Sequence, residues 1–167
     1  MEDFVKKLIL PFISAAMVAG VANWAVGAPD DPASQAAKEV QTAEIAKALA
    51  DASIIPAGQR SFVKCQACHM VGENAQPRVG PPLNGVVGRA AGTAEKFRYS
   101  PAMQKAATDG FVWTMEKLDA YLAAPRAVVP GTTMGFVGIP KPEERKALIA
   151  YLASFSADGA RIDGSAE

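Results

Sequence analysis

The sequence predicts an all-α protein with long irregular connections. Three observations lead to this prediction. Apolar residues recur at helical spacing in several segments, Gly and Pro gather in the stretches between them, and no run of alternating apolar and polar residues indicates a strand. Half of the 167 residues are apolar, which is enough to bury a core.

The chain begins with a long apolar segment. Residues 8–28, LILPFISAAMVAGVANWAVGA, follow Lys6 and Lys7. About 20 helical residues span the roughly 30 Å hydrocarbon core of a bilayer, so we predict that residues 1–28 form an uncleaved membrane anchor. The alternative is a cleaved signal peptide, because AVGA offers a cut site. With either reading, the two lysines predict a cytoplasmic N-terminus and an exported remainder.

Residues 29–56 are predicted to form a linker. They are rich in Ala, carry Pro at both ends and contain few bulky side chains. The stretch from Ser34 to Ala52 consists of good helix formers, and Ser34 is a candidate N-cap, so we expect a semi-rigid helical spacer. A disordered stub left after cleavage is the alternative.

Helical segments are predicted on both sides of a Gly- and Pro-rich stretch, residues 72–92. A short one carries Phe62 and leads into the sequence CQACH. Three more follow, each with Pro or a capping residue near its start and apolar residues at helical spacing. Their sequences are SPAMQKAATDG (100–110), TMEKLDAYLAAP with Thr114 as N-cap (114–125) and KPEERKALIAYLASF (141–155). We therefore predict a globular domain over residues 57–155 and a C-terminal tail over residues 156–167.

The charge balance bears on the class of partner. Seventeen basic and seventeen acidic residues give no net charge, which argues against a nucleic-acid-binding protein. The predicted domain alone carries twelve basic and seven acidic side chains, so it is mildly basic and its flanks are acidic.

The strongest chemical signal is the pentapeptide CQACH. It holds both cysteines of the chain, Cys65 and Cys68, and its single histidine, His69. A structural zinc site needs about four ligands, and a thioredoxin-like redox pair needs a βαβ context, and the sequence offers neither. Covalent attachment of haem requires two thiols and a histidine in this spacing. The sequence therefore predicts one covalent haem c with His69 as an iron ligand.

A second iron ligand is expected from a methionine. Met1 and Met17 lie in the leader, Met70 adjoins His69, and Met115 is expected in the core. Met103 and Met134 remain. We favour Met134, because it lies in a turn-rich segment, VVPGTTMGFVGIP, that could present a thioether to the ring.

Five stretches together resemble the class I c-type cytochromes, of which mitochondrial cytochrome c is a member. They are GQRSFVKCQACH, VGPPLNGVVGR, FRYSPAM, FVWTMEKLDAYLAAPRAVVPGTTMGFVGI and EERKALIAYLASF. With the leader and linker included, the chain resembles the membrane-anchored cytochromes of the c-y and c-552 type. The resemblance implies the class I cytochrome c fold, with Phe62 packing against Tyr151 of the last helix.

The resemblance also implies a role for each residue of the pocket. His69 and Met134 would be the axial ligands, and the carbonyl of Pro81 would accept a hydrogen bond from His69. Tyr121 would lie next to the methionine sulfur. The residues that would bind the haem propionates are Arg89, Tyr99, Trp113 and Thr132.

A one-electron carrier is the function that these features indicate, because two axial ligands leave the iron no open position for a substrate. By resemblance, electrons would come from a bc-type quinol-oxidising complex and pass to a haem-copper oxidase, a photosynthetic reaction centre or a denitrification reductase. The protein would lie in a bacterial inner membrane with one span and its haem domain in the periplasm. The alternative is a haem peroxidase or gas sensor with an open sixth iron site.

Overall fold

The computed structural model describes residues 32–163. The predicted membrane anchor, residues 1–28, and the start of the predicted linker lie outside the described residues. In the part described, the chain forms α-helices joined by long loops, with two isolated β-bridges and no strand. The elements are α1 (Pro32–Leu49), the 3₁₀ helix η1 (Ala52–Ile54), α2 (Ile55–Phe62), α3 (Pro101–Thr108), α4 (Met115–Ala123), α5 (Pro125–Val128) and α6 (Pro142–Ala153). The all-α prediction is confirmed. Over residues 32–163, no helix has the length and apolar character needed to cross a bilayer.

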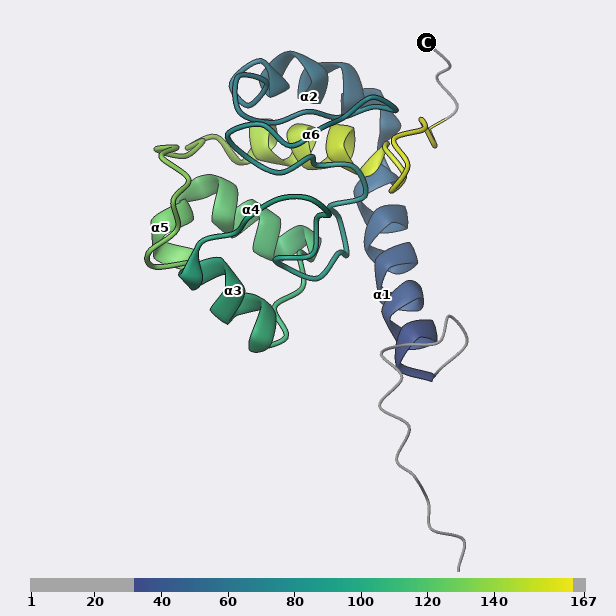
Figure 1. The fold of residues 1–167 in the computed structure, drawn as a ribbon. Coiled ribbons are helices and arrows are strands. Elements are labelled where there is room, and N and C mark those ends of the chain that lie inside the picture. Colours follow the sequence, from purple (N-terminus) through teal and green to yellow (C-terminus); the bar gives the residue numbers. More distant parts are fainter. Residues whose placement is uncertain (1–31, 164–167) are drawn as a thin grey trace, which may run out of the picture.

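The first helix of the predicted domain pairs with the last. Figure 1 shows α2 and α6 lying against each other at one end of the molecule. Gly58 of α2 lies against the backbone of Ala147 in α6, and the ring of Phe62 lies 5.5 Å from that of Tyr151. Leu148 and Ile149 of α6 are almost fully buried, so α6 forms the centre of the core.

Local capping explains where α3 and α4 begin. The Ser100 hydroxyl accepts a hydrogen bond from the Met103 N–H at 3.3 Å, and Thr114 accepts one from the Lys117 N–H at 3.2 Å. Each bond satisfies one of the N–H groups that a helix N-terminus leaves without an internal partner. Both helices were predicted, α4 with Thr114 as its N-cap and α3 from Pro101 in its first turn. The one-turn helix α5, which begins at Pro125, was not.

The segment predicted as a spacer contains α1. The prediction that Ser34 is its N-cap is wrong, because the helix already includes Pro32 and Ala33. The N-terminal half of α1 is exposed, whereas the C-terminal half packs against the globular part through Ala48, which is buried. Figure 1 shows α1 as a rod that meets the rest of the molecule at one end.

The described part of the predicted tail folds back against α6. The Ser156 N–H donates to the Ala160 carbonyl at 3.0 Å, and the Ile162 N–H donates to the Ser154 carbonyl at 2.9 Å. The guanidinium of Arg161 lies 4.8 Å from the centre of the Phe155 ring. These contacts cover the end of the core helix.

Candidate functional site

The CQACH segment continues the course of α2 as tight turns. The His69 N–H donates to the Cys65 carbonyl at 2.9 Å, and the Cys68 N–H donates to the same oxygen at 3.0 Å. Residues three and four apart lie on one side of such a turn. The two thiols and the imidazole are therefore presented to one side, as covalent attachment of a planar ring requires.

The imidazole of His69 is held by a backbone carbonyl. Its Nδ1 lies 2.7 Å from the Pro81 oxygen. Because a carbonyl oxygen only accepts, Nδ1 carries the proton in this bond, and Nε2 keeps its lone pair for a metal. Burial lowers the pKa of His69, and the bond to Pro81 opposes that shift. The ring is therefore neutral at neutral pH, as iron coordination requires.

Two further residues shape this loop, and the sequence analysis did not single them out. A Cβ at Gly80 would lie 2.2 Å from Cε1 of His69, so a larger residue there would displace the ring. The Asn84 amide bonds both the N–H and the carbonyl of Gly72, each at 2.9 Å. Small and polar residues inside the stretch VGPPLNG were the available signal, but their contacts lie eleven and twelve residues away in the chain.

The free thiols are partly buried. Burial raises the pKa of the Cys65 thiol to about 11, with Lys64 opposing the shift and Cys68 adding to it. At neutral pH this thiol is protonated, and it is therefore a weak nucleophile until another group activates it.

Of the two candidate methionines, Met134 lies in a loop and Met103 in a helix. Met103 belongs to α3 and is 8% exposed among core residues. Met134 is partly buried in the irregular segment that precedes α6. Its N–H donates to Oγ1 of Thr132 at 3.3 Å, and that hydroxyl is 2.9 Å from the Tyr121 hydroxyl. Burial raises the pKa of Tyr121.

The end of the Met134 loop is fixed by Arg145 of α6. Its guanidinium donates to the Ile139 carbonyl at 2.9 Å and to both carboxylate oxygens of Asp119 at 2.8 and 3.0 Å. The Ile139 N–H donates to the Leu122 carbonyl at 2.8 Å. The loop is therefore bound to both α4 and α6.

Arg89 is a partly buried cation, and its buried Nε is an unused donor. Its guanidinium donates to the carbonyls of Asn84 at 2.7 Å and Pro82 at 3.4 Å. Its Nε has no hydrogen-bond partner among residues 32–163. Burial lowers the pKa of Arg89, because desolvation disfavours the charged form. A buried charged donor without an acceptor is costly, so this site suits a carboxylate such as a haem propionate.

Direct contacts join several of the predicted pocket residues. The Trp113 N–H donates to the Arg89 carbonyl at 2.8 Å, and the Trp113 ring lies 4.8 Å from the Tyr121 ring. Tyr121 is bonded to Thr132 as described above. Tyr99 has a different partner: its hydroxyl accepts a hydrogen bond from the Ala94 N–H at 3.1 Å. The thiols, the imidazole Nε2, the thioether and the unused Arg89 donor together fit a covalent haem.

Comparisons with known proteins agree with this geometry. The family model for cytochrome c matches residues 55–156. A cytochrome c2 from Afifella marina is 49% identical over 106 residues, which are 64% of this chain and 86% of the relative. A cytochrome c-type cyt cy from Rhodobacter capsulatus is 52% identical over 98 residues, which are 58% of this chain and 46% of that longer relative.

Solved structures show the same fold. Cytochrome c2 from Rhodospirillum centenum matches with a TM-score of 0.56 and 40% identity, over 59% of this chain and 95% of that one. Cytochrome cH from Methylobacterium extorquens matches with a TM-score of 0.54 and the same identity and coverage. Helix α1 lies before the range that the family model matches.

Proposed function

The chain belongs to the cytochrome c family, and on this basis we propose that it is a membrane-tethered one-electron carrier. Its relatives are cytochromes c2 and c-550, and it is an electron carrier and not an enzyme. Its cofactor is a haem c bound covalently through Cys65 and Cys68. The peroxidase and sensor alternatives are therefore set aside.

The axial ligands of this proposal are His69 and Met134. The bond from His69 Nδ1 to the Pro81 carbonyl, 2.7 Å long, is the observation that carries the assignment. It fixes the tautomer and the plane of the ring, so that Nε2 faces outward as a ligand. The position of Met134 in a loop bound to α4 and α6 supports it as the second ligand, because the thioether can be offered without breaking a helix.

The other predicted residues are assigned to the propionates and to the methionine. We assign Arg89, Trp113, Tyr99 and Thr132 to the propionates. The unused Nε of Arg89 supports this assignment. Tyr121 is assigned to the neighbourhood of the Met134 sulfur, which the hydrogen bonds from Tyr121 to Thr132 and from Met134 to Thr132 support.

The haem, when bound, changes oxidation state by one electron without binding a substrate. Cys65 and Cys68 would hold the haem covalently, and His69, fixed by its bond to the Pro81 carbonyl, would orient it. A thioether ligand in an apolar pocket favours the reduced state and so raises the reduction potential. The partly buried guanidinium of Arg89 would offset the charge of a propionate.

The proposal also includes a membrane anchor, an electron donor and an electron acceptor. The apolar run of residues 8–28 supports an uncleaved anchor in a bacterial inner membrane, with the haem domain (57–155) in the periplasm. A bc-type quinol-oxidising complex would be the donor. A haem-copper oxidase, or else a photosynthetic reaction centre or a denitrification reductase, would be the acceptor. A tether raises the effective concentration of the carrier near both partners.

The optical spectrum of the purified holoprotein, oxidised and reduced, tests this function. The oxidised protein should show the weak long-wavelength band that the family resemblance attributes to a methionine–iron bond. Met134→Ala should abolish the band, whereas Met103→Leu, the matched change at the buried methionine, should keep it. A wild-type protein that lacks the band and binds carbon monoxide readily would contradict the proposal.

A further inference from the structure

The first observation is how α1 is seated on the loop before Arg89. The side-chain amide of Gln41 donates both of its hydrogens to this loop, to the Gly85 carbonyl at 3.0 Å and to the Val87 carbonyl at 3.2 Å. The next residue, Gly88, has a φ of +75°, and a Cβ there would lie 2.5 Å from Cα of Gln41. The backbone of α1 therefore comes so close to this loop that only glycine fits between them.

The second observation is a contact one turn farther along α1. The carboxylate of Glu44 accepts a hydrogen bond from the Met115 N–H, at the first residue of α4. Thr114 already satisfies the Lys117 N–H, so Glu44 supplies an acceptor for a second terminal N–H group of the same helix. A negative charge at a helix N-terminus is also favoured by the helix dipole.

These two contacts hold the backbones that carry Arg89 and Trp113. The Gly88 N–H donates to the Trp113 carbonyl at 2.8 Å, and the Trp113 N–H donates to the Arg89 carbonyl at 2.8 Å. Gln41 binds the first of these segments four and two residues before Arg89. Glu44 binds the second segment two residues after Trp113. Each contact is therefore two to four residues from a predicted propionate ligand.

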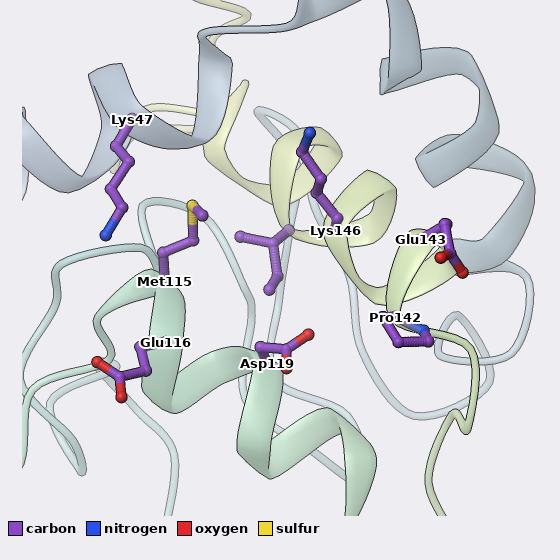
Figure 2. Close-up of a pocket in the computed structure, with 8 residues that line it drawn as sticks. Lys47, Met115, Glu116, Asp119, Pro142, Glu143 and Lys146 are labelled. Carbon is purple, nitrogen blue, oxygen red and sulfur yellow. The ribbon is translucent and has the colours of Figure 1, made fainter.

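A groove lies beside these contacts, between α1, α4 and α6. Past Met115, α1 and α4 border this groove of about 410 Å³, which Figure 2 shows with Lys47 of α1 on one side and Glu116 of α4 on the other. Lys146 of α6 lines the same groove. Ala48 of α1 is buried in the core, and the hydrogen bonds of Gln41 and Glu44 add specific polar contacts to the adjacent loop and to the start of α4.

We propose that α1 supports the haem pocket, and that Gln41 and Glu44 are positioning residues for Arg89 and Trp113. The proposal rests on the proposed function, since it assigns those two residues to the haem propionates. Positive charge close to a haem disfavours the more positive oxidised state, so loss of the two contacts should loosen Arg89 and lower the reduction potential. The segment predicted as a spacer would then tune the cofactor.

The test uses the full-length holoprotein with Gln41 and Glu44 both changed to Leu, which keeps the side-chain bulk and removes the hydrogen bonds. A redox titration against a one-electron mediator should show at least a twofold shift in the electron-transfer equilibrium toward the oxidised protein, which at 59 mV per tenfold is about 18 mV. Hydrogen exchange at the Gly88 and Trp113 amides should accelerate at least tenfold. The single variant Glu44→Gln retains an acceptor oxygen and should remain close to wild type in both measurements.

The matched controls are Glu39→Leu and Thr42→Ala. Both residues are exposed on α1, and the Thr42 hydroxyl donates to the Lys38 carbonyl of the same helix. Neither variant should change the reduction potential or the exchange of the two amides. If the double variant lowers the unfolding temperature but leaves both quantities at wild-type values, α1 is only a structural element and the proposal fails. That result is distinct from failure of the proposed function, which the wild-type spectrum reports.

Discussion

At the scale of single residues, Arg89 connects the fold to the cofactor. Its side chain is partly buried, and two of its nitrogens bond carbonyls of the chain. Its Nε is buried and has no acceptor among residues 32–163. A buried donor that is left without a partner typically costs 1–3 kcal/mol, and a charged one costs more. A propionate at this position would remove that cost, so binding of the haem and stability of the pocket should be linked.

Replacement of Arg89 separates its charge from its packing. Arg89→Met removes the positive charge and keeps much of the bulk, and it should lower the reduction potential by tens of millivolts, because the oxidised state is then less strongly disfavoured. Arg89→Lys keeps the charge and should lower it less. Spectroelectrochemical titration of the two variants measures the difference. An equal fall in both would assign the effect to lost geometry.

The residues of the site differ in how readily their roles can be predicted from the sequence. Cys65, Cys68 and His69 could be predicted because their chemistry depends on spacing within five residues. Gly80 and Asn84 could not, because each is defined by a contact with a residue eleven or twelve positions away. A motif of neighbouring residues can be recognised in the sequence. A contact between distant residues depends on the tertiary fold, which the sequence pattern does not give.

At the scale of elements, the pair α2 and α6 is joined at one end by Glu144. This residue is in the first turn of α6, and its carboxylate accepts a hydrogen bond from the Ser61 hydroxyl at 2.6 Å. It also forms an ion pair with Lys64, just beyond the end of α2. The bond from Lys64, and then that from Ser61, lower the pKa of Glu144.

The pH dependence of stability should report this contact. Because the pKa of Glu144 is lower in the folded protein, its contribution is present above the unfolded pKa of about 4.5 and is lost as the pH falls through the folded pKa. Glu144→Gln should cost up to about 1 kcal/mol at pH 7, and the difference from wild type should shrink below pH 4.5. Denaturant unfolding at several pH values measures it.

The control for this change is Glu143→Gln. It removes the same charge from the same helical turn at an exposed position, so it has the same effect on the helix dipole. Its unfolding free energy should stay close to wild type. If the stability difference of Glu144→Gln is the same at every pH, the contact with Lys64 and Ser61 is not its source.

Helices with local signals were predictable, and their docking was not. The starts of α3 and α4 follow from Ser100 and Thr114, which act within three residues. The packing position of α1 depends on hydrogen bonds from Gln41 to carbonyls 44 and 46 residues away. A periodic pattern of apolar residues does not predict such contacts. The predicted helical segment 114–125 includes Pro125, whereas α4 ends at Ala123 and Pro125 begins the one-turn helix α5.

At the scale of the whole molecule, the described structure includes folded residues on both sides of the range that the family model matches. The family model matches residues 55–156, whereas the ordered contacts described above extend from Gln41 to Ile162. The additions at both ends pack on the same core through Ala48 and through the return of residues 156–163 toward α6. The prediction of a haem domain over residues 57–155 can be tested by removing α1.

A chain that begins at residue 50 should still fold and hold haem, because the family match lies beyond that point. It loses the two bonds of Gln41, the bond of Glu44 and the burial of Ala48, which together should cost about 3 kcal/mol. The unfolding temperature should fall by on the order of 10 °C, as followed by circular dichroism. A chain that begins at residue 32 keeps α1 and is the control. If the shorter chain fails to fold, the predicted boundary at residue 57 is wrong.

The exposed half of α1 also sets a lower limit on distance. Residues 32–40 form helix without burying themselves, and at 1.5 Å per residue they extend for about 13 Å. A flexible connection allows its two ends to meet, but a helix keeps them apart. The start of α1 at Pro32 is therefore about this distance from the point at which Gln41 contacts the domain. For a tethered carrier, such a spacer would keep a gap beneath the domain in which it can turn its haem edge from one partner to another.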